Sequence, residues 1–264
     1  GSYLLTAAEH QMLKEVCGAF KRVAVLLNVG NIIDMKWVRE YDPAAVLYVW
    51  QGGQEGGAGA ADVLTGTVTP CGKLSDTIAL DISDYPSTEG FGDPTRVIYK
   101  EDIYVGYRYF ETFAKDRVLY PFGYGLSYTT FAYSNLQADE KGVTLTVTNT
   151  GDVEGREVVQ IYLQKPYTDY DKANGIEKAS VELVGFAKTG MLGAGESQKV
   201  TIPVAAESFK TYDANKAKTY ILEKGDYYFA FGNNAHDAVN NILAAKGYGQ
   251  KDGMTDVLGN ATDG

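Results

Sequence analysis

The spacing of apolar residues changes near residue 130, and this change constrains the fold more than any other feature of the sequence. In the first part of the chain, the continuous apolar runs 23–27 and 45–50 alternate with segments whose apolar residues recur at helical spacing. Such runs are typical of strands buried on both faces of a parallel sheet. After residue 130 apolar and polar residues alternate with a period of two, as in 143–147. We therefore predict an α/β domain with a mainly parallel sheet, followed by an all-β domain built as a sandwich.

Three helices are predicted in the α/β domain. Thr6 and Glu9 form a capping box that begins the first helix, which ends near Lys21. The second helix covers 37–41 and stops before a proline, and the third covers 58–64. In the all-β domain, further strands are predicted at 158–163, 179–186, 198–204, 219–222 and 227–231.

These patterns divide the chain into four parts. The α/β domain covers residues 1–85, a connecting segment and junction cover 86–129, the β-sandwich covers 130–240, and a linker or tail covers 241–264. The stretch 81–117 is irregular, polar and aromatic, so we expect a long connection with a few short strands. Aromatic and glycine residues alternate in 121–128, which indicates a rigid, tightly packed junction rather than a flexible linker.

The charge of the chain argues against two classes of partner. A formal net charge of -10 and a pI near 4.8 disfavour a nucleic-acid surface and binding to anionic membranes. The sequence contains no run of 18 apolar residues, which a membrane-spanning helix would need, and no signal peptide is seen. A cytoplasmic location is therefore favoured, although a chain that starts Gly1-Ser2 fits a tag scar, a processed chain or a fragment and leaves location open.

Two long motifs stand out in the sequence. Residues 103–131 read IYVGYRYFETFAKDRVLYPFGYGLSYTTF, and residues 50–77 read WQGGQEGGAGAADVLTGTVTPCGKLSDT. Both closely resemble signatures of family 3 glycoside hydrolases, the β-glucosidase-like enzymes. The second motif includes the turn 69–74, TPCGKL, which differs at two of six positions from the family's Asn-Pro-Ser-Gly-Lys-Leu. The resemblance implies that 1–85 is the C-terminal portion of the family's α/β-sandwich domain and that a fibronectin-III-like domain follows it.

The resemblance also implies retaining hydrolysis of terminal β-linked glucose or related sugars by two carboxylates. In the family the nucleophilic aspartate lies on a (β/α)8 barrel, which needs roughly 250 residues. Too few helix–strand units precede the β-sandwich here to build such a barrel. We therefore expect both the nucleophile and the acid/base glutamate outside this chain, and we expect the chain alone to be inactive.

The implied partners are the barrel, in cis or on another chain, and a glucoside or oligosaccharide substrate. A domain that packs on a barrel should expose an apolar patch, which we expect along 82–125 and the loop 50–57, and self-association through it is also open. The alternative is a non-catalytic carbohydrate-binding or structural module that acts alone. The order of the domains and the sugar are not determined by the sequence.

Four residues in the loop after the second apolar run are candidates for sugar binding: Trp50, Gln51, Gln54 and Glu55. The loop lies between a strand and a helix, where α/β sheets bind ligands. An indole can stack on a sugar, and amides suit hydroxyl groups. The alternatives are packing and loop hydrogen bonds for the first three residues, and a favourable charge at the helix N-terminus for Glu55.

The remaining polar residues predict no cofactor and no metal site. The glycine-rich run at 52–57 lacks the Lys-Ser/Thr ending of a phosphate loop, and His10 and His236 lie far apart. We interpret 167–175 as a solvated loop rather than a calcium site, and we expect Arg108 to pair with a carboxylate at the junction. Asp34, Asp76 and Asp81 are equal candidates for buried hydrogen-bonding carboxylates.

Overall fold

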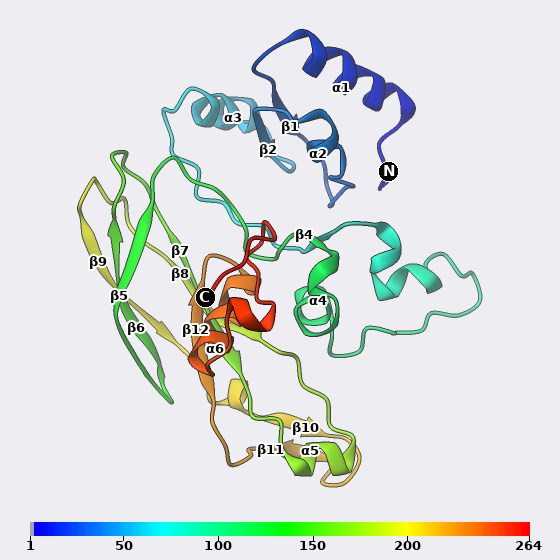
Figure 1. The fold of residues 1–264 in the computed structure, drawn as a ribbon, viewed down its shortest axis with the longest axis vertical. Helices are drawn as coiled ribbons and strands as arrows, with labels where there is room; N and C mark the ends of the chain where they lie inside the picture. Colours follow the sequence, from blue (N-terminus) through cyan, green and yellow to red (C-terminus); the bar gives the residue numbers. More distant parts are fainter. Residues whose placement is uncertain (1–2) are drawn as a thin grey trace. The chain divides into compact units, whose positions relative to one another are not determined.

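The computed structural model describes residues 3–264, which form two compact units (Figure 1). The first unit contains the described residues up to Val68 together with Ile78–Ile98 and Arg117–Tyr120. The second contains Thr69–Thr77, Tyr99–Asp116 and Pro121–Gly264. The chain therefore passes between the units more than once before it enters the all-β part.

The first unit has the predicted α/β character. Its helices are α1 Ala7–Ala19, α2 Trp37–Tyr41 and α3 Gly56–Leu64, and its strands β1 Ala24–Leu27 and β2 Ala45–Tyr48 pair in parallel. The predicted capping box is confirmed, since Thr6 Oγ1 accepts from the Glu9 amide and Glu9 Oε2 accepts from the Thr6 amide. A short antiparallel pair joins β3 Ile78–Ala79 to β4 Val118–Tyr120, next to the 3-10 turns η1 Ile82–Asp84 and η2 Pro86–Gly90.

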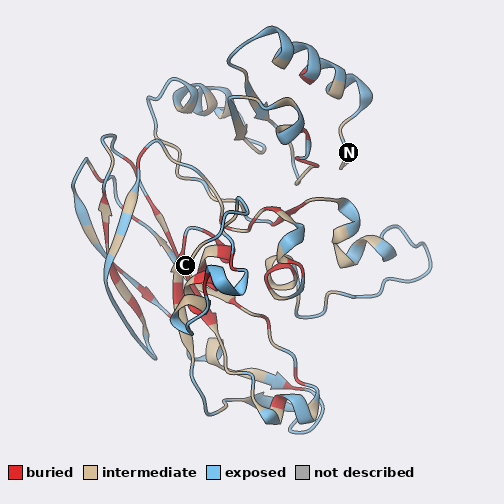
Figure 2. Cartoon of the chain, in the orientation of Figure 1, coloured by how far each residue is buried: buried red, intermediate tan, exposed pale blue. Residues whose placement is uncertain are grey.

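The prediction that the first two strands are buried on both faces was wrong. Residues of β1 alternate between exposed and half-buried, and Leu26 keeps 42% of its surface exposed. Two strands and three short helices do not supply enough neighbouring surface to cover both faces of the sheet. Figure 2 shows the result, because most of this unit is exposed or half-buried.

The second unit contains the predicted sandwich of two antiparallel sheets. One sheet has the order β5–β6–β9, with bounds Phe131–Asp139, Gly142–Asn149 and Ser197–Pro203. The other has the order β12–β7–β8, with bounds Tyr228–Gly232, Val158–Gln164 and Glu182–Lys188. Burial alternates along β6 with a period of two, as predicted, and Leu145 lies opposite Val200 in the core between the sheets.

Strand β7 is buried on both faces because a helix covers its outer side. Helix α6, Ala235–Ala245, packs Ala238, Val239 and Ile242 against Tyr162 of β7. The remaining elements of this unit are α4 Tyr107–Phe113, η3 Lys115–Arg117 (which ends in the first unit), α5 Asp169–Asn174, η4 Ala206–Phe209, the hairpin β10 Thr211–Asp213 with β11 Thr219–Ile221, and η5 Gln250–Asp252.

Two expectations about irregular segments differ from the structure. The stretch 81–117 contains 3-10 turns and α4 rather than short strands, and burial of Phe110 stabilises α4 as a helix. The predicted linker or tail from 241 onward includes the last turns of α6 and a buried Met254. His236 and Asn240 of α6 hold this segment by hydrogen bonds to the carbonyl oxygen of Thr255. The domain boundaries themselves remain predictions.

Candidate functional site

The loops that follow β1 and β2 lie together at the carboxyl edge of the parallel pair. The amide of Val49 donates to the carbonyl oxygen of Leu27 at 2.9 Å, so the pairing continues one residue past the end of β2. The hydroxyl of Tyr48 donates to the carbonyl oxygen of Asn31 at 2.8 Å. This is the edge at which open α/β sheets bind ligands.

Two of the predicted sugar-binding residues are held at this edge. The ring of Trp50 lies 4.4 Å from that of Tyr48, and the backbone of Trp50 is left-handed, with φ of 57°. The side-chain amide of Gln51 lies against Gly30, where an added Cβ would come within 3.0 Å of Gln51 Nε2. Left-handed backbone at a residue with a bulky side chain is strained, and such strain clusters at functional sites.

The other two predicted residues are exposed on the same loop. Gln54 and Glu55 both face solvent, and Glu55 occupies the N-cap position of α3. Its side chain makes no capping hydrogen bond, so any effect on the helix acts through charge alone. The structure therefore places the half-buried Trp50 against Tyr48, whereas Gln51, Gln54 and Glu55 are all exposed on the loop. The sugar-binding role of all four residues remains a prediction.

The three unranked aspartates have different environments. Asp34 is buried, its carboxylate accepts from the amide of Lys36, and the Lys36 ammonium lies 3.0 Å from Asp81. Hydrogen bonds from the backbone of Ser83, followed by the contact with Lys36, hold the pKa of Asp81 well below its usual range. Asp76 is exposed, and its carboxylate accepts from the hydroxyl of Ser75 at 3.0 Å. Asp34 is therefore the buried structural carboxylate of the three.

The predicted solvated loop 167–175 is instead the short helix α5 and its caps. Asp171 is fully buried, accepts from the amide of Thr168 and lies 2.7 Å from the ammonium of Lys178. Burial disfavours its charge, but Lys178 outweighs this and lowers the pKa of the carboxyl. Lys178 also contacts Glu223. The contacts of Asp171 with Thr168 and Lys178 therefore stabilise α5 and the segment that follows it.

The two motifs that resemble the family signatures are hydrogen-bonded to each other within the second unit. The amide of Leu74 donates to the carbonyl oxygen of Tyr124, and the amide of Gly123 donates to that of Leu74, both at 2.8 Å. Lys73 contacts the carbonyl oxygen of Gly125 at 3.1 Å and the carboxylate of Glu157 at 3.2 Å. Segment 69–74 is therefore hydrogen-bonded to segment 121–128 and ion-paired to the sandwich through Glu157.

Glycine is required where these segments meet. A Cβ on Gly125 would lie 2.1 Å from the carbonyl oxygen of Gly72, closer than any real contact. Gly123 has φ of 83°, and the side chain of Gln160 fills the space where its Cβ would be. The geometry agrees with the predicted close backbone approach, and the aromatic residues pack, as in the stacked pair Phe122 and Tyr107.

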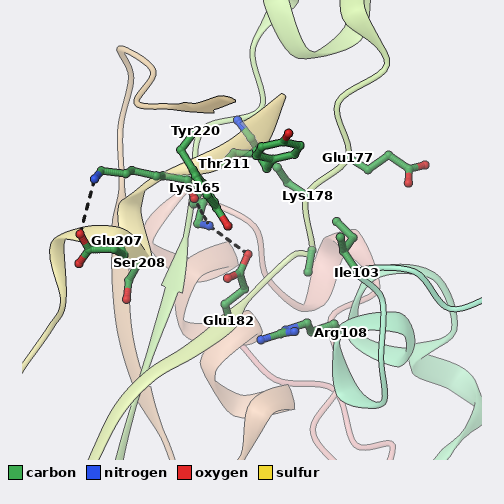
Figure 3. A pocket seen from close by; sticks show the side chains of 13 residues that line it. Ile103, Arg108, Lys165, Glu177, Lys178, Glu182, Glu207, Ser208, Thr211 and Tyr220 are labelled. Carbon is green, nitrogen blue, oxygen red and sulfur yellow. Dashed lines mark hydrogen bonds and ion pairs between the residues drawn. The ribbon is translucent and has the colours of Figure 1, made fainter. Parts of the chain in front are cut away.

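Arg108 lines a pocket that sequence reasoning missed. No carboxylate of the described chain pairs with its guanidinium, so the expected ion pair is not found; Nε is buried without a hydrogen-bond partner. The pocket has a volume of about 340 Å³ and is shown in Figure 3. Its other walls come from the segment between β7 and β8 and from the β10–β11 hairpin, which lie far apart in sequence. The paired Tyr212 and Tyr220 are the signal that could have pointed to it.

His236 belongs to a buried ion pair. Its Nδ1 lies 3.1 Å from Glu111 Oε2 on α4, and its Nε2 donates to the carbonyl oxygen of Thr255 at 2.8 Å. Burial by itself lowers the pKa of the imidazole, but the hydrogen bond and charge of Glu111 outweigh it and raise that pKa. Between residues 3 and 264 no cluster of three or more His, Cys, Asp or Glu side chains could hold a metal ion. None of the helices described has the length and apolar character to cross a membrane.

Known proteins resemble this chain over most of its length. The sequence profile of the "Glycosyl hydrolase family 3 C-terminal domain" matches residues 1–128, and that of the "Fibronectin type III-like domain" matches residues 157–235. A beta-glucosidase from Ruminococcus albus is 49% identical over 245 residues, which cover 90% of this chain and 25% of the relative. Beta-glucosidase A from Butyrivibrio fibrisolvens is 45% identical over 263 residues, which cover 90% of this chain and 31% of the relative.

A solved structure gives the same result. The beta-glucosidase from Paenibacillus barengoltzii superposes with a TM-score of 0.81 at 45% identity, over 89% of this chain and 27% of that protein. The chain spans between 25% and 31% of the length of these three relatives. The α/β domain, the sandwich and both motifs occur in the expected order. The chain therefore belongs to glycoside hydrolase family 3, and it comprises the family's C-terminal α/β domain followed by a fibronectin type III-like domain.

Proposed function

We propose that this chain is the non-barrel part of a retaining β-glucosidase-like hydrolase. Combined with a (β/α)8 barrel, it would help hydrolyse terminal β-linked glucose or related sugars. The observation that carries the proposal is the similarity, at 45% identity or more, to proteins named beta-glucosidases that are three to four times as long. Retaining hydrolysis needs a nucleophilic carboxylate and an acid/base carboxylate on opposite sides of the glycosidic bond. We propose that both come from outside the chain.

The loop after β2 is the part of this chain that we assign to the sugar. Trp50 is fixed by Tyr48 and by its own strained backbone, so its indole has a defined orientation. The side chain of Gln51 lies against Gly30, and the exposed Gln54 can contact hydroxyl groups. We expect Glu55 to act through its charge at the N-terminus of α3. A site on pre-positioned side chains loses little conformational entropy on binding, which favours affinity.

The test compares this chain with a longer polypeptide that also carries the barrel. With a chromogenic aryl β-glucoside, residues 1–264 should give no turnover above background, whereas the longer polypeptide should hydrolyse the substrate. Turnover by the short chain that survives repurification would overturn the proposal. A native polypeptide whose measured mass leaves no room for a barrel would instead support a non-catalytic module.

A further inference from the structure

We propose that the pocket between β8, Arg108 and the β10–β11 hairpin is a binding site for a neutral sugar unit of an oligosaccharide. All residues that line the pocket belong to the second unit. Its volume of about 340 Å³ falls in the range of small-molecule sites. The proposal does not depend on hydrolysis and would hold for a catalytic or a non-catalytic protein.

The first observation is an unsatisfied donor. Nε of Arg108 is buried and has no hydrogen-bond partner within residues 3–264. Leaving such a donor without a partner costs roughly 1–3 kcal/mol, and more for a charged group. The guanidinium is positioned by α4 and lies 5.8 Å from the ring of Tyr107. A hydroxyl oxygen of a ligand in the pocket would satisfy this donor.

The second observation is the balance of charge around the pocket. Lys165 Nζ lies 3.3 Å from Glu182 Oε1 and donates to the carbonyl oxygen of Lys210 at 2.8 Å, as the dashed lines in Figure 3 indicate. Lys210 Nζ lies 3.6 Å from Glu207. Lys178 is already matched by its own carboxylate partners. The pocket therefore holds charges of both signs, and each of its three lysines has a carboxylate partner.

Charges of both signs around one pocket disfavour an ionic ligand of either sign. A carboxylate or phosphate ligand would meet Glu182 and Glu207, together with Glu177, which makes no ion pair with a described residue. A cationic ligand would meet Arg108 and Lys165. A ligand with many neutral hydroxyl groups suits both signs, since a hydroxyl can accept from Arg108 and donate to Glu182.

The third observation is an aromatic surface at the pocket. Tyr212 and Tyr220 face each other across the hairpin, with ring centroids 5.2 Å apart. They keep 52% and 67% of their surface exposed, so both rings are accessible to a ligand. Tyrosine offers an apolar ring face together with a hydroxyl group. The C–H face of a pyranose ring matches such a surface while its hydroxyl groups reach the charged wall.

The experiment titrates the full chain with cellotetraose, a neutral β-linked oligosaccharide, by calorimetry and by saturation-transfer NMR. We expect saturable binding with transfer to the sugar ring protons. Tyr220→Ala and Tyr212→Ala should each raise Kd about tenfold, because each removes one ring of the surface. Arg108→Lys keeps the charge but removes the Nε donor, and should also weaken binding about tenfold.

The matched control is Tyr248→Ala, since Tyr248 is 51% exposed in the same unit but does not line the pocket. It should leave Kd unchanged. Absence of saturable binding at roughly 10 mM sugar, a concentration well above the Kd of a weak 1 mM site, would overturn the proposal. Tighter binding of tetragalacturonate than of cellotetraose would overturn the neutral-sugar assignment. If Tyr220→Ala fails to fold by circular dichroism, Tyr212→Ala and Arg108→Lys decide the question.

Discussion

The two units bury their apolar residues to very different extents. In the sandwich, Leu145 and Ile161 keep 1% and 0% of their surface exposed. In the first unit Leu13 is the buried residue of α1, and none of the residues of α3, all of them described, is buried. The sandwich therefore has an enclosed core of its own, whereas the first unit presents apolar faces that nothing in the described chain covers.

The difference shows that a sequence pattern typical of buried segments does not by itself ensure burial. Other parts of the fold must also cover the apolar residues. Met12 and Phe20 of α1 are 55% and 65% exposed, and in the connecting segment Phe91, Val97 and Tyr99 are 92%, 73% and 89% exposed. Apolar exposure was predicted along 82–125, and it occurs there, but α1 exposes apolar residues as well. The loop 50–57 carries none of the large exposed apolar residues. Under the proposed function, the missing cover is the barrel and its attached segments.

The largest expected effect is that of Gly125→Val in the second unit. The new side chain would overlap the backbone carbonyl of Gly72, which cannot move without breaking the hydrogen bonds between the two signature segments. We expect a loss of about 3 kcal/mol or more in the unfolding free energy of the second unit. Differential scanning calorimetry measures it, with Gly72→Ala as control because open space surrounds that position. If the melting temperatures of both units fall by the same amount, the units unfold as one cooperative block. The contrast drawn between the two units would then be wrong.

A matched pair of leucines tests the comparison directly. Leu145→Ala, which empties a position in the sandwich core, should cost about 2–5 kcal/mol in urea unfolding. Leu26→Ala in β1 should cost under about 1 kcal/mol, because this side chain is already 42% exposed. An equal cost for both would mean that the first unit is covered in solution, for example by a second copy, and sedimentation would then show the oligomer.

The pH dependence should separate the units in the neutral range. The pKa of His236 is raised in the folded protein by Glu111, against burial and the charge of Lys115. A raised folded pKa gives stability that is complete below the unfolded value of about 6.5 and is lost as pH rises through the folded pKa. The melting temperature of the second unit should therefore fall as the pH rises above about 6.5. His236→Gln should abolish this fall, whereas His10→Gln, in the first unit, should leave it unchanged; an unchanged profile in His236→Gln would refute the assignment.

The smallest expected effect is that of Glu55→Gln. Because Glu55 makes no capping hydrogen bond, loss of its charge should cost no more than about 0.5 kcal/mol in the first unit. In the polypeptide that carries the barrel, hydrolysis of an aryl β-glucoside should be nearly unchanged. Gln54→Glu, which adds a charge at the neighbouring position, serves as the control. A thousandfold loss of turnover at an unchanged melting temperature would place Glu55 in the sugar site instead.

Local signals were sufficient to predict most elements of the fold. The capping box at Thr6, the proline that follows α2 and the alternation along β6 each act within a few residues. Helices α4 and α6 were missed because contacts with β7 and with each other stabilise them, and such contacts have no local pattern. The pocket proposed to bind a sugar was missed for the same reason, since Arg108, Glu182 and Tyr220 come from three separate segments.

The side chain of Gln160 in β7 connects the signature segment 121–128 to the residue that follows β12. This connection has a consequence for the order of folding. Its Nε2 donates to the carbonyl oxygens of Gly123 and Asn233, at sequence separations of 37 and 73 residues, and its Oε1 accepts from Tyr162. Contacts at such separations form late, because the intervening chain must be ordered first. The signature segment therefore leaves the ribosome long before its last partner is synthesised. Until β12 pairs with β7, the segment lacks its contact with Asn233 through Gln160, and its aromatic residues stay accessible to chaperones.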